Sequence, residues 1–199
     1  MLRPKALLPW RGSTFLQEIT KTFQQAGLAS IIVVIREGEL GQQIAELVKD
    51  VATVVVNPDP DRGMLSSLQC GAHALLAQQI SQALITPVDQ PQLEVALCQR
   101  LCQALAQGQW AVAAHGQQWG HPYACPELRE LMALDPSQSA QLTLQKKAPL
   151  LIEGGPQVLF NLNTPEEYHA AYLSSVVAEA RPNKALGAKP NSTEKEPST

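Results

Sequence analysis

Residues 30–57 read SIIVVIREGELGQQIAELVKDVATVVVN, and this stretch decides the fold class. Residues 30–35 and 52–56 are short apolar runs rich in β-branched residues, which is typical of strands covered on both faces. Residues 39–48 between them carry apolar side chains at helical spacing. Two buried strands joined by a helix form a βαβ unit, so the sequence predicts parallel strands and a layered α/β fold.

The rest of the chain continues this alternation. Further helices are predicted over 14–27, 65–79, 93–106, 127–134 and 165–178. Further strands are predicted over 83–86, 110–114, 150–153 and 158–161. Loops are predicted over 57–63, 87–92 and 117–126, where proline, glycine or polar residues interrupt the pattern.

The chain length fits one domain. With 199 residues, 45% of them hydrophobic, the chain can form a single α/β domain, which we place at 1–180. After Arg181 the composition changes to Pro, Asn, Lys, Gly, Ser, Thr and Glu, with almost nothing to bury. Ordering such a segment costs conformational entropy without return, so residues 181–199 are predicted to be a disordered tail.

Composition and charge narrow the function classes. The formal net charge is −3 and the basic residues are scattered, so we expect no nucleic-acid partner. No apolar run approaches the roughly 20 residues of a membrane span, and residues 1–10 lack the features of a secretory signal. We therefore expect a cytoplasmic protein with no membrane partner.

The four cysteines allow two interpretations. Cys98 and Cys102 would share one face of a helix and could ligate a metal, but no CxxC or HxxxH spacing accompanies them. We favour the second interpretation, in which Cys70, Cys98, Cys102 and Cys125 are small buried thiols in a reducing compartment.

The loop after the strand at 83–86 contains the sharpest candidate for chemistry. Residues 87–91 read PVDQP, which places the carboxylate of Asp89 between two prolines at a strand end. Ligands collect at the carboxyl ends of strands in open α/β sheets, and a carboxylate there can bind Mg²⁺ together with nucleotide phosphates and water. The alternative is a turn aspartate that caps the following helix.

Two other loops also follow predicted strands. Residues 63–67, GMLSS, lead into a helix whose free amides and hydroxyls could hold an anion or a base edge; the alternative is a glycine turn with a serine cap. In NLNTPEE at 161–167, Thr164 and Glu167 predict a capping box with Pro165 at the first helical position. Asn161 and Asn163 are then free to direct amide oxygens toward a metal or a sugar.

His121 lies in the sequence WGHPY at 119–123, which is more polar and aromatic than a simple linker. A loop histidine is more often solvated than catalytic. No Ser/His/Asp order and no HExxH pattern supports a hydrolase.

Taken together and in order, these motifs resemble the MobA-like nucleotidyltransferases, and among them the molybdenum-cofactor cytidylyltransferases most. The resemblance covers roughly 3–177. It rests on RPKALLPWRG at 3–12, NP at 57–58, GMLSSL at 63–68, PVDQP at 87–91, GHP at 120–122 and NLNTPEE at 161–167.

The resemblance implies a three-layer α/β/α fold of the nucleotide-diphospho-sugar transferase type, Rossmann-like and GT-A-like, with a mixed, mostly parallel sheet. It also implies a reaction. A nucleoside monophosphate passes from an NTP, with CTP favoured, to a phosphorylated acceptor such as molybdopterin or the molybdenum cofactor, and pyrophosphate leaves. Such chemistry depends on positioning and charge neutralisation, here with Mg²⁺, and needs no catalytic nucleophile.

The resemblance also assigns residues. Asp89 binds Mg²⁺ and acts with Lys5 in catalysis, Lys5 meeting the NTP phosphates. Asn161 or Asn163 helps at the metal, where many relatives have aspartate. The nucleotide pocket is assigned to Lys5, Asn57, Gly63, Met64, Ser66 and Ser67. The acceptor is assigned to Gly120, His121 and Pro122.

The sequence departs from the family pattern at its start. Family members open with a buried strand and a loop of the form LAAGxSxRMG, directly before the proline and lysine that are Pro4 and Lys5 here. Met1 stands where the methionine of RMG belongs, and Leu2 replaces its glycine. In the family that segment supplies backbone amides and an arginine to the triphosphate, and a central strand of the sheet. The expected fold therefore lacks its first strand.

Two explanations compete for this late start. We expect a start codon upstream and an active, longer protein, because a missing central strand would leave backbone groups unpaired in the core. The alternative is a catalytically silent remnant that acts as a binding or partner protein. A third hypothesis keeps the nucleotidyl transfer but directs it to another small phosphorylated acceptor.

Overall fold

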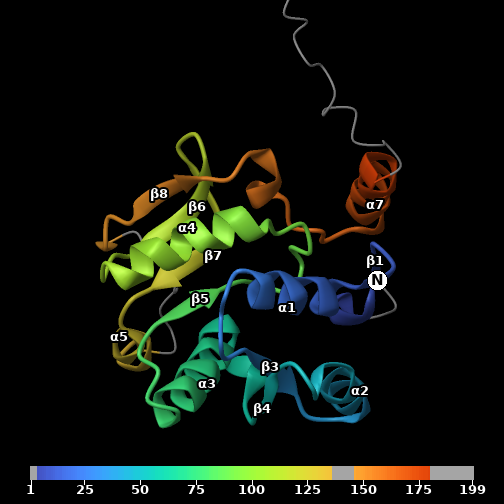
Figure 1. Ribbon diagram of the computed structural model, residues 1–199. Coiled ribbons are helices and arrows are strands. Elements are labelled where there is room, and N and C mark those ends of the chain that lie inside the picture. Colours follow the sequence, from blue (N-terminus) through green and yellow to red (C-terminus); the bar gives the residue numbers. More distant parts are fainter. Residues whose placement is uncertain (1–3, 136–145, 180–199) are drawn as a thin grey trace, which may run out of the picture.

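In the computed structural model of the chain, residues 4–135 and 146–179 are described (Figure 1). They form helices packed on both faces of strands, as the α/β prediction requires. The tail predicted over 181–199 and the motif positions Met1 and Leu2 lie outside the described residues. The absent first strand and the two explanations for it stay predictions.

The βαβ unit predicted over residues 30–57 is present. Strands β3 (Ile32–Arg36) and β4 (Thr53–Asn57) pair in parallel and are joined by α2 (Glu39–Val48). Val33 packs on one face with the cluster that includes Val48 of α2, whereas Val34 meets Gly71 of α3 on the other face. Because both faces are covered, the strand carries an unbroken apolar run.

A second sheet has four strands in the order β5 (Ala83–Ile85), β7 (Gln118–Cys125), β6 (Ala111–His115) and β8 (Leu150–Glu153). β7 is antiparallel to both β5 and β6, and β6 is parallel to β8. Strands β5, β6 and β8 therefore run in one direction and β7 runs against them. The sheet is mixed, as predicted.

The helices make the outer layers. The apolar core on one face joins α1 (Phe15–Gln25) and α4 (Val95–Ala106) to Leu84 and Ala113. The core on the other face joins α3 (Met64–Ala77) and α5 (Leu128–Met132) to Ala83 and Val112. Neighbouring strand residues thus point to opposite layers, which is the two-residue period of a strand. Within the described ranges, no helix is long and apolar enough to cross a lipid bilayer.

The two sheets are separate. In the described part of the chain, the β3–β4 pair is not joined by β-ladder hydrogen bonds to the four-stranded sheet. Two helices bridge them instead. Leu16 of α1 belongs to the cluster of the first sheet and Phe23 of α1 to that of the second. On the opposite face, α3 sets Gly71 against the first sheet and Ala72 in the cluster of the second.

The loop predicted over 117–126 is wrong, because most of this segment is β7, between β5 and β6. Its sequence contains Gly120 and Pro122, which normally interrupt strands. The ladder with β6 shifts register between Val112 and Ala114, and Gly120 and Pro122 fall in the part of β7 that the paired residues skip. A β-bulge therefore accommodates both residues inside a strand.

The strand predicted over 158–161 is also wrong. Residues Pro156–Leu159 form a 3₁₀ helix, η3, with Pro156 in its first turn. The apolar run was too short to separate a strand from a buried helical turn. Within the described residues, further small elements were not predicted: η1 (Lys5–Leu7), β1 (Pro9–Trp10), β2 (Ser13–Thr14) and η2 (Pro60–Arg62).

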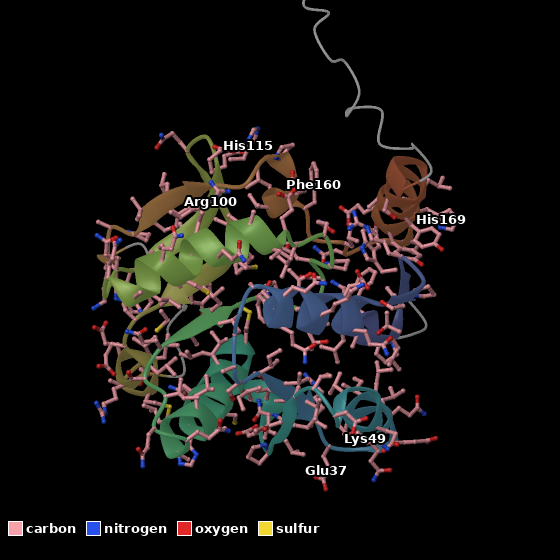
Figure 2. All side chains as sticks on the ribbon, viewed as in Figure 1. Glu37, Lys49, Arg100, His115, Phe160 and His169 are labelled. Atoms are coloured by element: carbon pink, nitrogen blue, oxygen red, sulfur yellow. The ribbon has the colours of Figure 1, made fainter. Side chains whose placement is uncertain are left out.

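Helix α7 (Pro165–Glu179) begins at the predicted capping box. Thr164 Oγ1 accepts from Glu167 N at 3.1 Å, and Glu167 Oε2 accepts from Thr164 N at 2.9 Å. The Tyr168 hydroxyl donates to Pro9 O at 3.0 Å, and its ring packs on Phe15. This aromatic cluster fixes α7 beside the β1–β2 hairpin. Phe160 lies on the segment that leads to α7 (Figure 2).

The close packing of β7 on η3 generates a stability prediction. A Cβ at Gly120 would lie 2.0 Å from the carbonyl oxygen of Val158, so Gly120→Ala must push the two elements apart. We expect the free energy of unfolding in urea to fall by about 1–3 kcal/mol. Gly71→Ala is the control, since its Cβ would meet side-chain carbons and no backbone: Val34 Cγ2 at 3.3 Å and Ile32 Cγ2 at 4.0 Å. Equal, small effects of the two substitutions would contradict the prediction.

Candidate functional site

Three of the predicted site residues meet at one point. Lys5 Nζ donates to Asp89 Oδ2 at 3.0 Å and also to Asn163 Oδ1. The three residues come from η1, from the loop after β5 and from the segment before α7. Ala6, which follows Lys5, and Val88, which precedes Asp89, pack in the same apolar cluster. That cluster fixes the backbones of Lys5 and Asp89 close together.

The Asp89 carboxylate is only partly used. Its side chain is 17% exposed, and Oδ2 pairs with Lys5. Oδ1 is buried and has no hydrogen-bond partner among the described residues. A buried carboxylate oxygen without a partner is costly, and such an atom at a site of this kind points to a ligand that satisfies it.

Backbone and amide contacts join the Asp89 loop to the segment before α7. Leu162 N donates to Asp89 O at 3.1 Å. Gln90 is 1% exposed, and its Nε2 donates to Val158 O at 3.2 Å and to Asn161 Oδ1 at 2.8 Å. These contacts set the distance between Asp89 and Asn163, because Asp89 is next to Gln90 in the chain and Asn163 is next to Leu162.

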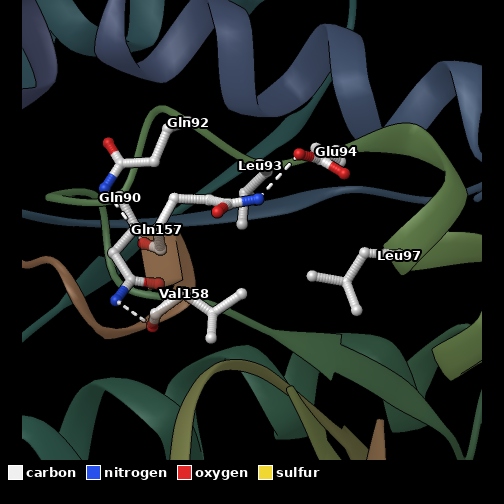
Figure 3. Close-up of a pocket in the computed structure, with 7 residues that line it drawn as sticks. All are labelled: Gln90, Gln92, Leu93, Glu94, Leu97, Gln157 and Val158. Carbon is white, nitrogen blue, oxygen red and sulfur yellow. Dashed lines mark hydrogen bonds between the residues drawn. The ribbon is translucent and has the colours of Figure 1, made fainter. Parts of the chain in front are cut away.

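Sequence reasoning missed the role of Gln90 and of its neighbour Gln92, which donates to Phe160 O at 2.9 Å. Figure 3 shows Gln90 reaching Val158, and Gln157 reaching Glu94, across the space between the two segments. These side chains leave no room there for a water-sized molecule. The region is a structural junction and not a ligand pocket. No characteristic spacing marks Gln90 and Gln92 in the sequence, although both lie within three residues of Asp89.

The two asparagines take different positions. Asn161 Oδ1 accepts from Gln90, so this oxygen is already occupied within the junction. Asn163 Oδ1 instead meets the Lys5 ammonium beside Asp89. Of the two predicted metal-side residues, Asn163 is the one whose oxygen shares the Lys5 ammonium with the Asp89 carboxylate.

His121 lies at the same edge of the sheet as Asp89. Because Ile85 pairs with Tyr123, the earlier residues of β7 run beyond the end of β5 and alongside the Asp89 loop. Burial lowers the pKa of His121 below its usual value, and the Asp89 charge only partly opposes this. The imidazole is therefore neutral at pH 7, and its Nδ1 is buried without a partner among the described residues.

Gly120 and Pro122 flank His121, and both pack against the protein interior. Gly120 lies against the Val158 carbonyl, and Pro122 is a large, fully buried side chain that follows a cis peptide bond. Their assignment to an acceptor stays a prediction. His121 is the member of the motif that offers a polar atom.

The residues assigned to the nucleotide pocket organise their own loop. Asn57 is 2% exposed, and its Nδ2 donates to Ser66 Oγ at 2.8 Å and to Ser67 Oγ at 3.0 Å. Ser66 Oγ donates in turn to Gly63 O at 2.8 Å. Gly63 has φ +87°, a conformation that favours glycine, and it is the N-cap residue before α3. Met64 follows on the surface, 63% exposed.

The donors at Asp89 suit a hard cation. Mg²⁺ prefers oxygen ligands and keeps several sites for water and phosphate. One carboxylate oxygen without a partner, with the Asn163 amide oxygen beside it, matches that preference. Among the residues described, no group of three or more His, Cys, Asp or Glu could hold an ion. A metal at Asp89 would therefore take most of its ligands from nucleotide and water.

Other features of the chain lie apart from this site. A cleft of about 390 Å³ lies between α1 and the start of α4, lined by residues that include Arg11, Lys21 and Glu94. It contains none of the predicted site residues. Cys98 and Cys125 are buried free thiols, and burial raises the pKa of each to about 12, which makes them unreactive.

Comparison with known proteins gives one curated relative and several solved structures. Nicotine blue oxidoreductase of Paenarthrobacter nicotinovorans is 34% identical over 113 residues, which are 56% of this chain and 53% of that protein. The chain thus spans about half the length of this curated relative.

The solved structures match over most of the chain. Rv0371c from Mycobacterium tuberculosis H37Rv, in complex with manganese, is 23% identical with a TM-score of 0.68, covering 86% of this chain and 92% of that one. A nucleotidyl transferase from Methanothermobacter thermautotroptrophicus is 22% identical with a TM-score of 0.69, covering 87% and 86%. At these identities the likeness shows the fold, and it confirms the α/β class predicted from the sequence.

The family follows from the sequence itself. The profile of the MobA-like NTP transferase domain matches residues 1–150, which include the Lys5 segment, the Asn57 loop, Asp89 and the His121 motif. The resemblance to the MobA-like family is thereby confirmed, whereas the narrower resemblance to the molybdenum-cofactor cytidylyltransferases stays a prediction. The chain belongs to the MobA-like NTP transferase domain family.

Proposed function

We propose that this protein is a Mg²⁺-dependent nucleotidyltransferase that moves a nucleoside monophosphate from an NTP, with CTP favoured, to a phosphorylated acceptor such as molybdopterin or the molybdenum cofactor. The observation that carries the proposal is the Asp89 carboxylate, which keeps one buried oxygen without a partner beside Lys5 and Asn163. Family membership supports the class of reaction. The preference for CTP and for this acceptor rests on the resemblance of the motifs to the molybdenum-cofactor cytidylyltransferases.

The reaction is a phosphoryl substitution. A phosphate oxygen of the acceptor attacks the α-phosphorus of the NTP, the bond from that phosphorus to the bridging oxygen of the β-phosphate breaks, and pyrophosphate leaves. Mg²⁺ held at Asp89, with Asn163 beside it, would neutralise charge on the phosphates. Lys5 would add a positive charge against the NTP phosphates. The catalytic contribution of the chain is therefore positioning and charge balance.

The neutral His121 fits an orienting role in this scheme. A neutral imidazole can donate one hydrogen bond and accept another, whereas a protonated one can only donate. His121 is partly buried near Asp89, and its Nδ1 has no partner among the described residues, which supports a role in holding the acceptor near the metal. The Asn57 loop, which follows strand β4, is the candidate for the nucleotide.

The experiment that tests the function is a pyrophosphate-release assay with Mg²⁺, a molybdopterin acceptor and either CTP or GTP. We expect release with CTP to exceed release with GTP by about tenfold. The reaction without acceptor is the blank. Faster release with GTP would overturn the choice of nucleotide, and release only with another phosphorylated acceptor would favour that alternative. No release with any combination would favour the silent remnant.

Removal of the Asp89 charge tests the metal site. Asp89→Asn keeps the shape of the side chain and the backbone contact from Leu162, so the fold should be retained. We expect the rate of pyrophosphate release to fall by about 100-fold or more, because Asp89 no longer holds the Mg²⁺ that neutralises the phosphate charge. Asp61→Asn is the control, since its side chain is 88% exposed and pairs only at the surface with Arg36. An unchanged rate in Asp89→Asn would remove Asp89 from the site.

Truncation of Asn57 tests the nucleotide loop. Asn57→Ala removes the hydrogen bonds to Ser66 and Ser67 and leaves buried polar groups without partners. We expect the Kd of CTP, measured by calorimetry, to rise about tenfold as the loop loses its geometry. Ser30→Ala is the control, because it removes one exposed contact, to Gln78. A Kd equal to that of the unmodified chain would exclude the Asn57 loop from nucleotide binding.

A further inference from the structure

The Lys5 ammonium stands where a divalent cation would have to bind. A single positive group contacts one carboxylate oxygen and one amide oxygen, Asp89 Oδ2 and Asn163 Oδ1, which come from two different loops. A cation shared by oxygens from separate segments is the arrangement of a metal site. Here the cation is a side chain of the protein itself.

We propose that Lys5 is an internal competitor of the metal: it occupies the cation position between Asp89 Oδ2 and Asn163 Oδ1 until a nucleotide arrives, and a divalent ion coordinates these two oxygens only by displacing it. This inference rests on the proposed function, which makes Asp89 a metal ligand.

Distance makes the two cations mutually exclusive at the shared oxygens. The ammonium lies 3.0 Å from Asp89 Oδ2, whereas Mg²⁺ binds oxygen at about 2.0–2.1 Å. A divalent ion between Asp89 and Asn163 at that distance would meet the ammonium at close range, where like charges repel strongly. Lys5 must therefore leave before both oxygens can turn to the metal.

Lys5 has the freedom to leave. Its side chain is 29% exposed, and the long alkyl stem can reorient without disturbing the buried Ala6 that follows it. Without nucleotide, the displaced ammonium loses a carboxylate partner and gains only water. With nucleotide, the phosphates offer new anionic partners, so displacement costs less. Metal and nucleotide therefore bind cooperatively, each raising the affinity of the other.

The test measures Mn²⁺ binding to the full chain in the absence of nucleotide, with free Mn²⁺ followed by electron paramagnetic resonance. Lys5→Met removes the competing charge and keeps the apolar stem, so we expect the Kd of Mn²⁺ to fall about tenfold relative to the unmodified chain. Lys21→Met is the matched control, because Lys21 is 62% exposed and lies near Glu18 on α1. It should leave the Kd unchanged.

Further variants keep the result interpretable. Lys5→Gln also removes the charge but retains a polar end, and it should tighten Mn²⁺ binding in the same direction if Lys5→Met folds poorly. Adding Asp89→Asn to either variant should abolish the gain. Equal Kd values for the unmodified chain and both Lys5 variants would overturn the competition while leaving the metal site in place. No Mn²⁺ binding by any variant would overturn the metal site itself, and with it this inference.

Discussion

The backbone hydrogen bond from Leu162 to Asp89 is the contact on which the rest of the site depends. It joins the loop after β5 to the segment that starts α7, two stretches separated by most of the second sheet. Gln90, buried beside it, adds bonds to Val158 and Asn161. The carboxylate and the amide that share the Lys5 ammonium can meet only because this junction fixes their backbones. The candidate metal site therefore depends on tertiary structure more than on any one motif.

The sequence was most informative where local chemistry decides structure. The apolar runs at 30–35 and 52–56 predicted a parallel pair that is present, and the capping box of Thr164 and Glu167 forms as expected. It misled at 117–126, because a bulge opposite Val112 and Ala114 places Gly120 and Pro122 inside a strand. Bulges depend on the partner strand, which the local sequence does not specify.

At the candidate site too, local features were predicted from the sequence and long-range contacts were not. The strand-end position of Asp89 predicted a ligand site, and its partner Lys5 followed from the family resemblance. The buried glutamine next to Asp89 was not predicted, since a glutamine has no characteristic spacing and its partners lie far along the chain. Asn57 was assigned to the nucleotide, yet its amide hydrogens bind serines of its own loop. Polar residues near a site can serve the site by shaping the backbone, and sequence patterns do not separate that role from direct contact.

The division into two sheets has a consequence for motion. In the described part of the chain, packing of α1 and α3, and not a shared ladder, holds the β3–β4 pair beside the four-stranded sheet. The Asn57 loop follows β4 of the two-stranded sheet, and the Asp89 loop follows β5 of the four-stranded sheet. Side-chain packing yields to small sliding displacements more readily than a ladder does. A shear of the two helices would therefore change the distance between the two loops without breaking a strand pairing.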